Sequence, residues 1–251
     1  MTSTVEPLLL GRSMGSDEGS LGFCSVMLVT TVLPGAPAHR ILFDTGHAGR
    51  RRALIRELHR VGLTPGDIDA VVLSHSHWDH VQNVDLFPRA RVLMHPDELV
   101  YAESPGPDDL GVPPWTSSLL SAARPHPVRP DEQVVAGVRV LHLPGHTAGS
   151  IGLVVEASDG LHVLTGDAVS TAFAMGARRC AAAHHDLRLS EESIDLVGAT
   201  ADVVWPGHDR AFRVADGRPA GYLVEPTSLV FRVRGRPASP DDLATSPRPA
   251  T

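Results

Sequence analysis

The segment from His75 to His80, which reads HSHWDH, constrains the fold of this chain more than any other feature. It directly follows Ala70–Ser74, a run that is apolar until its end and typical of a strand buried on both faces. Side chains two residues apart in an extended backbone point to the same side, so those of His75 and His77 can reach one ion. Asp79 and His80 follow where the chain turns toward a helix. Imidazole and carboxylate are the ligands that zinc accepts without thiolate, so the segment predicts a metal site.

Three later strands end in residues of the same kind. The predicted strands and the residues that follow them are Val138–Leu143 with His146, Leu161–Thr165 with Asp167, and Asp202–Trp205 with His208. Proline and glycine stop the first and third strands abruptly and leave a histidine at the carboxyl end. A histidine-rich surface loop without metal does not account for these matching contexts. Side chains delivered by strand ends are held by the sheets, as a preorganised site requires.

The order of elements predicts a mixed α/β domain with layered sheets, because β-branched runs alternate with helical patterns. Further strands are expected at Phe23–Leu33, Arg40–Phe43, Arg91–His95 and Ile151–Glu156, and helices at Gly49–Val61, Pro96–Ala102, Pro114–Ala123 and Ser190–Ala199, the last with Ser190 as its N-cap. Residues 1–20 are expected to lead into a single domain over 21–235. Residues 236–251, rich in proline, serine and alanine, are expected to form a disordered tail.

Charge and composition narrow the range of partners. The formal charge of -7 counts against nucleic acid and anionic membranes as ligands. Two cysteines, Cys24 and Cys180, cannot form a CxxC metal site and are expected to be ordinary buried thiols. The N-terminus does not read as a secretory signal, and no apolar stretch is long enough for a membrane span. We expect a cytoplasmic protein that acts on a small molecule, with a homodimer left open.

The order HxHxDH, PGHT, GD and PGH resembles the metallo-β-lactamase superfamily over residues 20–213, and the turn Phe43-Asp44-Thr45-Gly46 resembles the family's early DTG turn. The resemblance implies an αββα sandwich that holds two zinc ions. It assigns His75, His77 and His146 to one zinc, Asp79, His80 and His208 to the other, and Asp167 to the bridge between them. Residues 83–88 and 201–214 resemble one subgroup of the family.

This resemblance favours a hydrolase that cleaves a carboxylic ester, lactone or thioester by attack of a metal-bound hydroxide. Asp79 would pass the proton to the leaving group. Asp44 would orient a metal-bound imidazole, unless it serves only the backbone turn. Gln82 stands where the family usually carries glycine. Together with His184 and His185, it is a candidate for the substrate pocket.

Other functions use the same ligand types. A phosphodiesterase or nuclease could use the same metal pair, although the acidic charge and the lack of a basic stripe count against it. An iron-dependent oxidoreductase is disfavoured, because the di-iron branch usually carries glutamate at the position of His77. A metal-binding scaffold without turnover is a poor fit to a complete ligand set. Manganese, iron and cobalt would also accept these ligands.

Overall fold

The computed structural model describes residues 1–17, 19–20, 22–180, 182–226, 232–233 and 236–237. The strands are β1 (Thr2–Leu9), β2 (Gly15–Ser16), β3 (Gly19–Ser20), β4 (Val26–Val32), β5 (His39–Phe43), β6 (Ala70–Val72), β7 (Arg91–Met94), β8 (His126–Pro127), β9 (Gln133–Val135), β10 (Val138–His142), β11 (Ile151–Ala157), β12 (Gly160–Gly166), β13 (Val203–Pro206), β14 (Phe212–Ala215), β15 (Arg218–Tyr222), β16 (Arg232–Val233) and β17 (Arg236–Pro237). The helices are α1 (Arg51–Arg60), α2 (Trp78–Val81), α3 (Pro96–Glu103), α4 (Trp115–Ala123), α5 (Ala172–Gly176) and α6 (Leu187–Thr200), with short 3₁₀ helices at Ala48–Arg50, Pro65–Asp67, Val84–Leu86 and Asp167–Val169.

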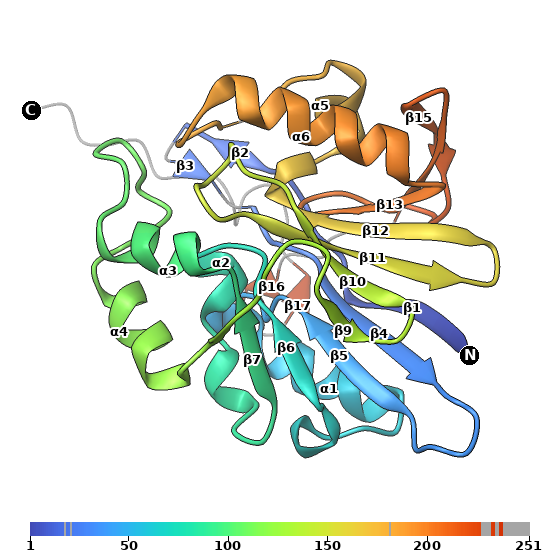
Figure 1. The fold of residues 1–251 in the computed structure, drawn as a ribbon. Coiled ribbons are helices and arrows are strands. Elements are labelled where there is room, and N and C mark those ends of the chain that lie inside the picture. Colours follow the sequence, from blue (N-terminus) through green and yellow to red (C-terminus); the bar gives the residue numbers. More distant parts are fainter. Residues whose placement is uncertain (18, 21, 181, 227–231, 234–235, 238–251) are drawn as a thin grey trace, which may run out of the picture.

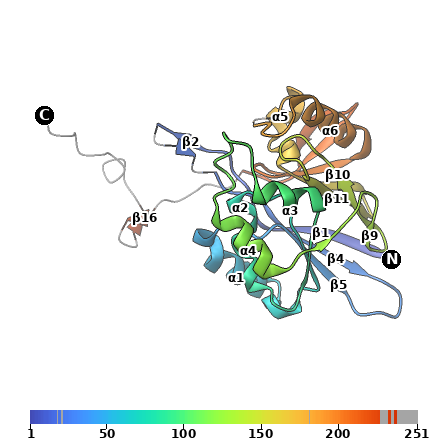
Figure 2. The same ribbon diagram turned by 60° about the vertical axis from the view of Figure 1, so that its left-hand side comes forward.

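These elements stack in four layers, helix, sheet, sheet and helix (Figure 1). A 13-stranded sheet runs in the order β15-β14-β13-β12-β11-β1-β4-β5-β6-β7-β8, with β10 paired to β11 and β9 to β10. One apolar core lies between the two halves of this sheet. A second core lies under α1, α3 and α4, and a third under α5 and α6, on the opposite side of the molecule (Figure 2). The layered α/β sandwich expected from the sequence is confirmed.

Strand β4 shows why the central strands read as unbroken apolar runs. Val26 and Leu28 belong to the core under the first group of helices, whereas Met27 and Val29 belong to the core between the sheet halves. Successive side chains of a strand point to opposite faces, so a strand covered on both faces needs an apolar residue at every position. The same alternation recurs in β5, β6 and β7. Burial on both faces fixes the strands whose ends carry the site.

Strand β1, within the segment 1–20 that was expected to lead into the domain, is part of the large sheet. It pairs with β4 in antiparallel fashion and with β11 in parallel at Ser3, so it joins the two halves of the sheet. Its sequence, TSTVEPLL, lacks a clean apolar alternation because Glu6 and Pro7 interrupt it. The register with β4 shifts between Pro7 and Leu9, where a residue without an N–H can be accommodated.

The strands expected between residues 23 and 205 are all present with slightly different ends. The helix expected at Ser190 begins earlier, at Leu187, so Ser190 is not its N-cap. Asp186 takes that role, because its Oδ1 accepts a hydrogen bond of 2.8 Å from the Leu189 N–H. The Ser190 hydroxyl instead donates to the Leu187 carbonyl. An aspartate three residues before Leu189 caps the helix as well as a serine would.

The segment 236–251, expected to be a tail, starts with β17, and residues 238–251 lie outside the described part of the chain. Among the described residues, no helix is long and apolar enough to cross a membrane.

Candidate functional site

The predicted ligand residues meet where strands from both halves of the sheet end. His75 to His80 occupy the loop after β6 and the start of α2. His146, Asp167 and His208 follow β10, β12 and β13 respectively. Strands β5, β6 and β7 run parallel to one another, and so do β12 and β13. Side chains far apart in the sequence are thereby brought to one edge of the sandwich.

Three of the imidazoles form the first group. The ring centroids of His75, His77 and His146 lie 4.6 to 4.8 Å from one another. His77 Nδ1 lies 3.2 Å from His146 Nε2. One nitrogen from each ring and one Asp167 carboxylate oxygen all lie within 4.8 Å of one another. These four side chains could hold one metal ion.

The second group lies on the other side of Asp167. His208 Nε2 is 3.2 Å from Asp167 Oδ2 and 3.6 Å from Asp79 Oδ2. His80 Nε2 is 3.4 Å from Asp167 Oδ1 and 3.8 Å from Asp79 Oδ2. The Asp167 carboxylate thus faces both groups, and the arrangement could hold two ions with this carboxylate between them.

Several ligand atoms in these groups are buried and have no hydrogen-bond partner among the described residues. They are His75 Nε2, His80 Nε2 and Asp167 Oδ1. Leaving a buried polar atom unpaired costs about 1–3 kcal/mol, so three such atoms aimed at one place need an explanation. A bound cation supplies it, because each of these atoms has a lone pair to donate. The donor set of imidazole and carboxylate fits zinc.

The pKa values favour neutral rings at His75 and His146 in the first group and a protonated ring at His80 in the second. Burial, and next to it the neighbouring His77, lowers the pKa of His146 to about 3, so its ring is neutral at pH 7. Burial also lowers the pKa of His75. Burial would raise the pKa of Asp167, but His208 and His80 hold it well below its ordinary range. Burial alone would lower the pKa of His80, but the carboxylates of Asp79, Asp167 and Asp44 raise it to about 10. The surroundings of His80 therefore favour a positive charge.

Asp44 contacts His80 of the second group at Nδ1, the ring nitrogen that does not face Asp167. Its Oδ2 lies 2.8 Å from His80 Nδ1 and accepts a 2.8 Å bond from the Ser74 hydroxyl, while Oδ1 accepts from the Ser74 N–H. Its φ of 59° is a left-handed value that few residues other than glycine adopt. With Nδ1 engaged by Asp44, the Nε2 atom of His80 is left facing Asp167 and Asp79, as the sequence-based role for Asp44 requires.

Asp109 performs the equivalent contact for the first group, and no sequence signal points to it. Its side chain is fully buried, and Oδ2 lies 3.0 Å from His77 Nε2. The Tyr101 hydroxyl donates to the same oxygen at 2.7 Å, and the Gly111 N–H donates to Oδ1. Burial would raise the pKa of Asp109, but the bonds from His77, Tyr101 and Gly111 hold it far below its ordinary range. His77 Nδ1 is thereby turned toward His146.

Glu98 joins the two loops that carry the first group. This fully buried carboxylate on α3 accepts from the Ser76 N–H and hydroxyl through Oε1. Through Oε2 it accepts from the Thr147 hydroxyl at 2.7 Å and the Gly149 N–H at 2.9 Å. A single side chain therefore fixes the HSHWDH loop against the PGHT loop. In the sequence, Glu98 reads as a surface residue of a helix.

The two cysteines lie close to the site as buried thiols. Cys24 Sγ donates to the Asp79 carbonyl oxygen at 2.9 Å, and burial raises the pKa of this thiol. Cys180 Sγ lies 3.2 Å from the Ala182 carbonyl oxygen, and burial raises its pKa to about 11.

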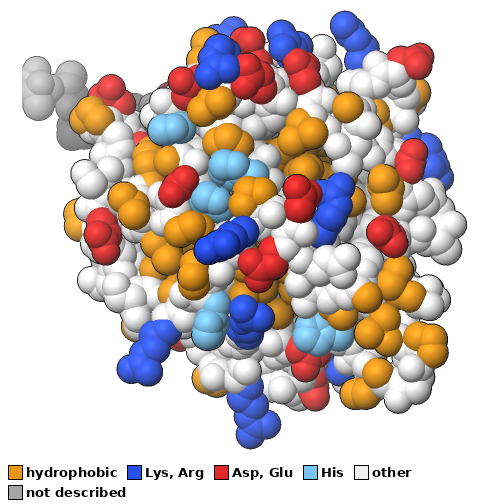
Figure 3. Space-filling view, in the orientation of Figure 1, with side chains coloured by type: hydrophobic (Ala, Val, Ile, Leu, Met, Phe, Trp, Pro, Cys, Tyr) orange, Lys and Arg blue, Asp and Glu red, His pale blue; other side chains and the backbone are white. Residues whose placement is uncertain are grey.

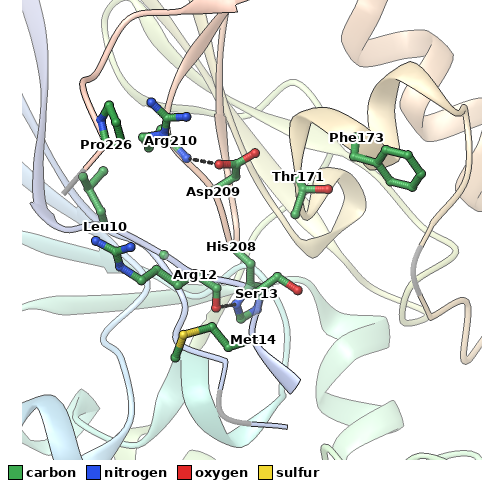
Figure 4. Close-up of a pocket in the computed structure, with 11 residues that line it drawn as sticks. Leu10, Arg12, Ser13, Met14, Thr171, Phe173, His208, Asp209, Arg210 and Pro226 are labelled. Carbon is green, nitrogen blue, oxygen red and sulfur yellow. Dashed lines mark hydrogen bonds between the residues drawn. The ribbon is translucent and has the colours of Figure 1, made fainter. Parts of the chain in front are cut away.

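Two cavities that share lining residues lie beside the ligands. A cavity of about 130 Å³ is lined by His146, Asp167 and His208, together with Ser13, Ser170 and Cys180. A larger cavity of about 480 Å³ shares Ser13 and His208 with it and extends away between the residues after β1, the start of α5 and the loop before β14 (Figure 4). On the face drawn in Figure 3, histidine side chains reach the surface beside hydrophobic ones.

None of the three pocket candidates is among the residues that line these two cavities. Gln82 Oε1 accepts from the Ala48 N–H, and Gln82 does not line either cavity. The His184 ring lies beside the first group, 5.4 Å from the His77 ring and with Nε2 3.7 Å from Asp109 Oδ1, but outside both linings. His185 is exposed. The cavity residues Leu10 to Met14 come from the segment after β1.

Comparisons with known proteins agree with the geometry. The sequence model of the metallo-β-lactamase superfamily matches residues 19–208. Metallo-β-lactamase domain-containing protein 1 of Rattus norvegicus is 31% identical over 188 residues, which are 73% of this chain and 67% of that protein. This is the subgroup that residues 83–88 and 201–214 resemble. N-acyl homoserine lactonase AiiB of Agrobacterium fabrum is 33% identical over 174 residues, 62% of each chain.

A solved structure of AiiA from B. thuringiensis has the same fold, with a TM-score of 0.64 at 23% identity, and the match covers 83% of this chain and 94% of that one. The chain spans about two thirds of the curated relatives' length. With the family match over residues 19–208 and the His/Asp cluster at the strand ends, the chain belongs to the metallo-β-lactamase superfamily of metal-dependent hydrolases.

Proposed function

We propose that the chain is a binuclear zinc hydrolase that cleaves a carboxylic ester, lactone or thioester of a small molecule. The observation that carries this proposal is the Asp167 carboxylate, which lies between two histidine groups with buried, unpaired ligand atoms on both sides. His75, His77 and His146 would hold one ion, and Asp79, His80 and His208 the other. When bound, a pair of zinc ions lowers the pKa of water and polarises a carbonyl oxygen.

The residues around the pair have defined tasks in this reaction. Hydrolysis breaks the bond between the acyl carbon and the leaving oxygen or sulfur, and water gives OH to the first and H to the second. Asp79 is buried, 8% exposed, with Oδ2 facing both His80 and His208, so its carboxylate can carry that proton to the leaving atom. Asp44 and Asp109 hold two of the ligand rings in orientation. The cavity over His146 and His208 admits the substrate.

The substrate class is supported by one relative and by the charge of the chain. The similar protein of Agrobacterium fabrum is named as an N-acyl homoserine lactonase, and a lactone is a cyclic ester. The net charge of -7 counts against a polyanionic substrate.

The test is a substrate panel of lactones, thioesters, esters and phosphodiesters, assayed with zinc-loaded and chelator-treated protein whose metal content is measured. We expect hydrolysis of carboxylic acyl compounds only in the loaded protein. Asp79→Ala should lower kcat by about 10²–10⁴, whereas Asp85→Ala, a nearby exposed aspartate, should not. Turnover of phosphodiesters alone, full activity without metal, or an active Asp79→Ala variant would each contradict the proposal.

A further inference from the structure

One wall of the larger cavity carries charged side chains to which the proposed hydrolysis gives no role. In Figure 4, Arg12 and Arg210 lie on the same side of the cavity as Leu10 and Pro226, while Thr171 and Phe173 lie on the opposite side and His208 at the base. The lining contains two cationic side chains and a single carboxylate, that of Asp209. A substrate whose scissile bond lies over Asp167 would extend past His208 toward this wall, because the two cavities share His208 and Ser13.

The Asp209 carboxylate does not neutralise this wall. It accepts three hydrogen bonds, from the Arg210 N–H at 2.8 Å, the Ala172 N–H at 3.1 Å and the Tyr222 hydroxyl at 2.8 Å. Among the described residues, no carboxylate forms a salt bridge with the Arg210 guanidinium, which contacts the Val224 carbonyl oxygen and the Tyr222 ring. The role of Asp209 is to anchor the backbone after His208 and to fix the Tyr222 ring.

Arg210 is held in place with donors to spare. Its guanidinium carbon lies 3.8 Å from the centroid of the Tyr222 ring, and one Nη donates to the Val224 carbonyl oxygen at 2.9 Å. A guanidinium has five N–H donors in a planar fork, so the contacts with Val224 and Tyr222 leave donors for a ligand. The stack on Tyr222 fixes the plane of the fork before a ligand arrives, which reduces the entropy lost on binding.

We infer that the substrate carries a carboxylate at the end remote from its scissile bond, and that Arg210, helped by Arg12, binds it. This rests on the proposed hydrolysis of an acyl compound. A planar guanidinium fork matches a carboxylate with two parallel hydrogen bonds. The apolar side chains of Leu10 and Met14 in the same lining would pack on the methylene chain between the two ends.

The test compares para-nitrophenyl esters of equal chain length that differ only at the far end. The carboxylate-ended substrates are the mono-esters of adipic and suberic acid, and the neutral ones are the hexanoate and octanoate esters. With zinc-loaded protein we expect kcat/KM to favour the carboxylate-ended esters by about tenfold or more, the effect of a hydrogen bond between charged groups. Arg210→Met should remove most of that preference, because kcat/KM for the carboxylate-ended esters falls more than kcat/KM for the neutral ones. Arg12→Met should reduce it in the same direction.

The controls separate a specificity role from a structural one. Arg213→Met, an exposed arginine on β14 outside the cavity lining, should keep the full preference. An equal loss on both ester types in Arg210→Met would mean that Arg210 only supports the fold, and it would overturn the inference. Equal kcat/KM for both ester types in the wild-type protein would overturn it as well, while leaving the hydrolase proposal in place.

A calorimetric titration with adipate and with hexanoate tests the carboxylate site independently of the proposed hydrolase activity. If no ester is hydrolysed, the hydrolase proposal fails, but tighter binding of adipate that is lost in Arg210→Met still supports the carboxylate site. Adipate binding that is unchanged in Arg210→Met contradicts it.

Discussion

Asp109 shows at the residue scale how this site depends on side chains that touch no substrate. Its carboxylate holds His77 Nε2 and leaves Nδ1 for a metal ion. Outer partners of this kind typically contribute about 10–100-fold to metal affinity. We therefore expect Asp109→Asn to weaken zinc binding by about that factor, because the amide loses the charge and one acceptor oxygen. Competition with a chromophoric chelator measures the zinc Kd directly, without an activity assay.

Asp108 is the matched control, since it is exposed and adjacent in sequence. Asp108→Asn should bind zinc as the wild-type protein does. An unchanged zinc Kd in Asp109→Asn, with the fold intact by circular dichroism, would show that the His77 ring needs no carboxylate to hold its orientation.

The sequence predicts the ligand candidates but not the residues that support them, for a physical reason. His75 to His80 share one loop, and His146, Asp167 and His208 each follow an obvious strand end. Their spacing is therefore a local property that can be read from the chain. Asp109 and Glu98 act across 32 and up to 51 residues of sequence, and their partners are set only by how helices and loops pack. Gln82, His184 and His185 were selected by position and stay predictions for the substrate pocket; none of them is in the lining of the two cavities described above.

At the scale of elements, the central strands could be predicted from the sequence because both of their faces are buried. Strand β1 could not be predicted in this way. An unbroken apolar run such as β4 needs no partner to be recognised. In β1, Glu6 and Pro7 hide a strand that only its pairing with β4 and β11 reveals. The start of α6 was misplaced because two capping residues, Asp186 and Ser190, lie four positions apart.

Strands β7 and β10 meet through a stacked pair of histidines at their ends. The His95 and His142 rings lie 4.5 Å apart with an angle of 13° between them. Burial lowers the pKa of both, and for His142 the neighbouring His95 lowers it further. Both groups are therefore less basic in the folded state than in the unfolded state, where the pKa is near 6.5. Their contribution to stability is present above pH 6.5 and is lost as the pH falls through the folded-state values.

His142→Phe should flatten this dependence, because phenylalanine keeps a ring against His95 and does not titrate. Between pH 7 and 5, the free energy of unfolding of chelator-treated wild-type protein should fall by more than that of the variant. Urea titrations at each pH measure the difference. His59→Phe, at an exposed position on α1, should follow the wild-type curve. Parallel curves for His142→Phe and the wild-type protein would exclude a titrating role for the stack.

At the scale of the whole molecule, the site joins the two halves of the sandwich. The ligand loop after β6 belongs to one half of the sheet, and the loops after β10, β12 and β13 belong to the other. Among the ligand side chains of the described residues, His77 Nδ1 and His146 Nε2 contact each other directly across the two halves. Three other ligand atoms, His75 Nε2, His80 Nε2 and Asp167 Oδ1, are buried without a hydrogen-bond partner. Four carboxylates, those of Asp44, Asp79, Asp109 and Asp167, gather within this region. Bound cations would both satisfy the unpaired atoms and offset that charge.

Removal of metal should therefore lower the stability of the whole domain rather than loosen one loop. A ligand present at about 100 times its Kd stabilises the folded state by about 2.7 kcal/mol, which for a chain of this size corresponds to roughly 5–10 °C in Tm. We expect a single calorimetric transition that shifts downward by about that amount on chelation and returns when zinc is added. The shift should be much smaller in a His80→Ala, His146→Ala double variant, which lacks one ligand from each group, and unchanged in His59→Ala. Loss of zinc without any change in Tm would mean that the contacts between the two halves hold the site together on their own.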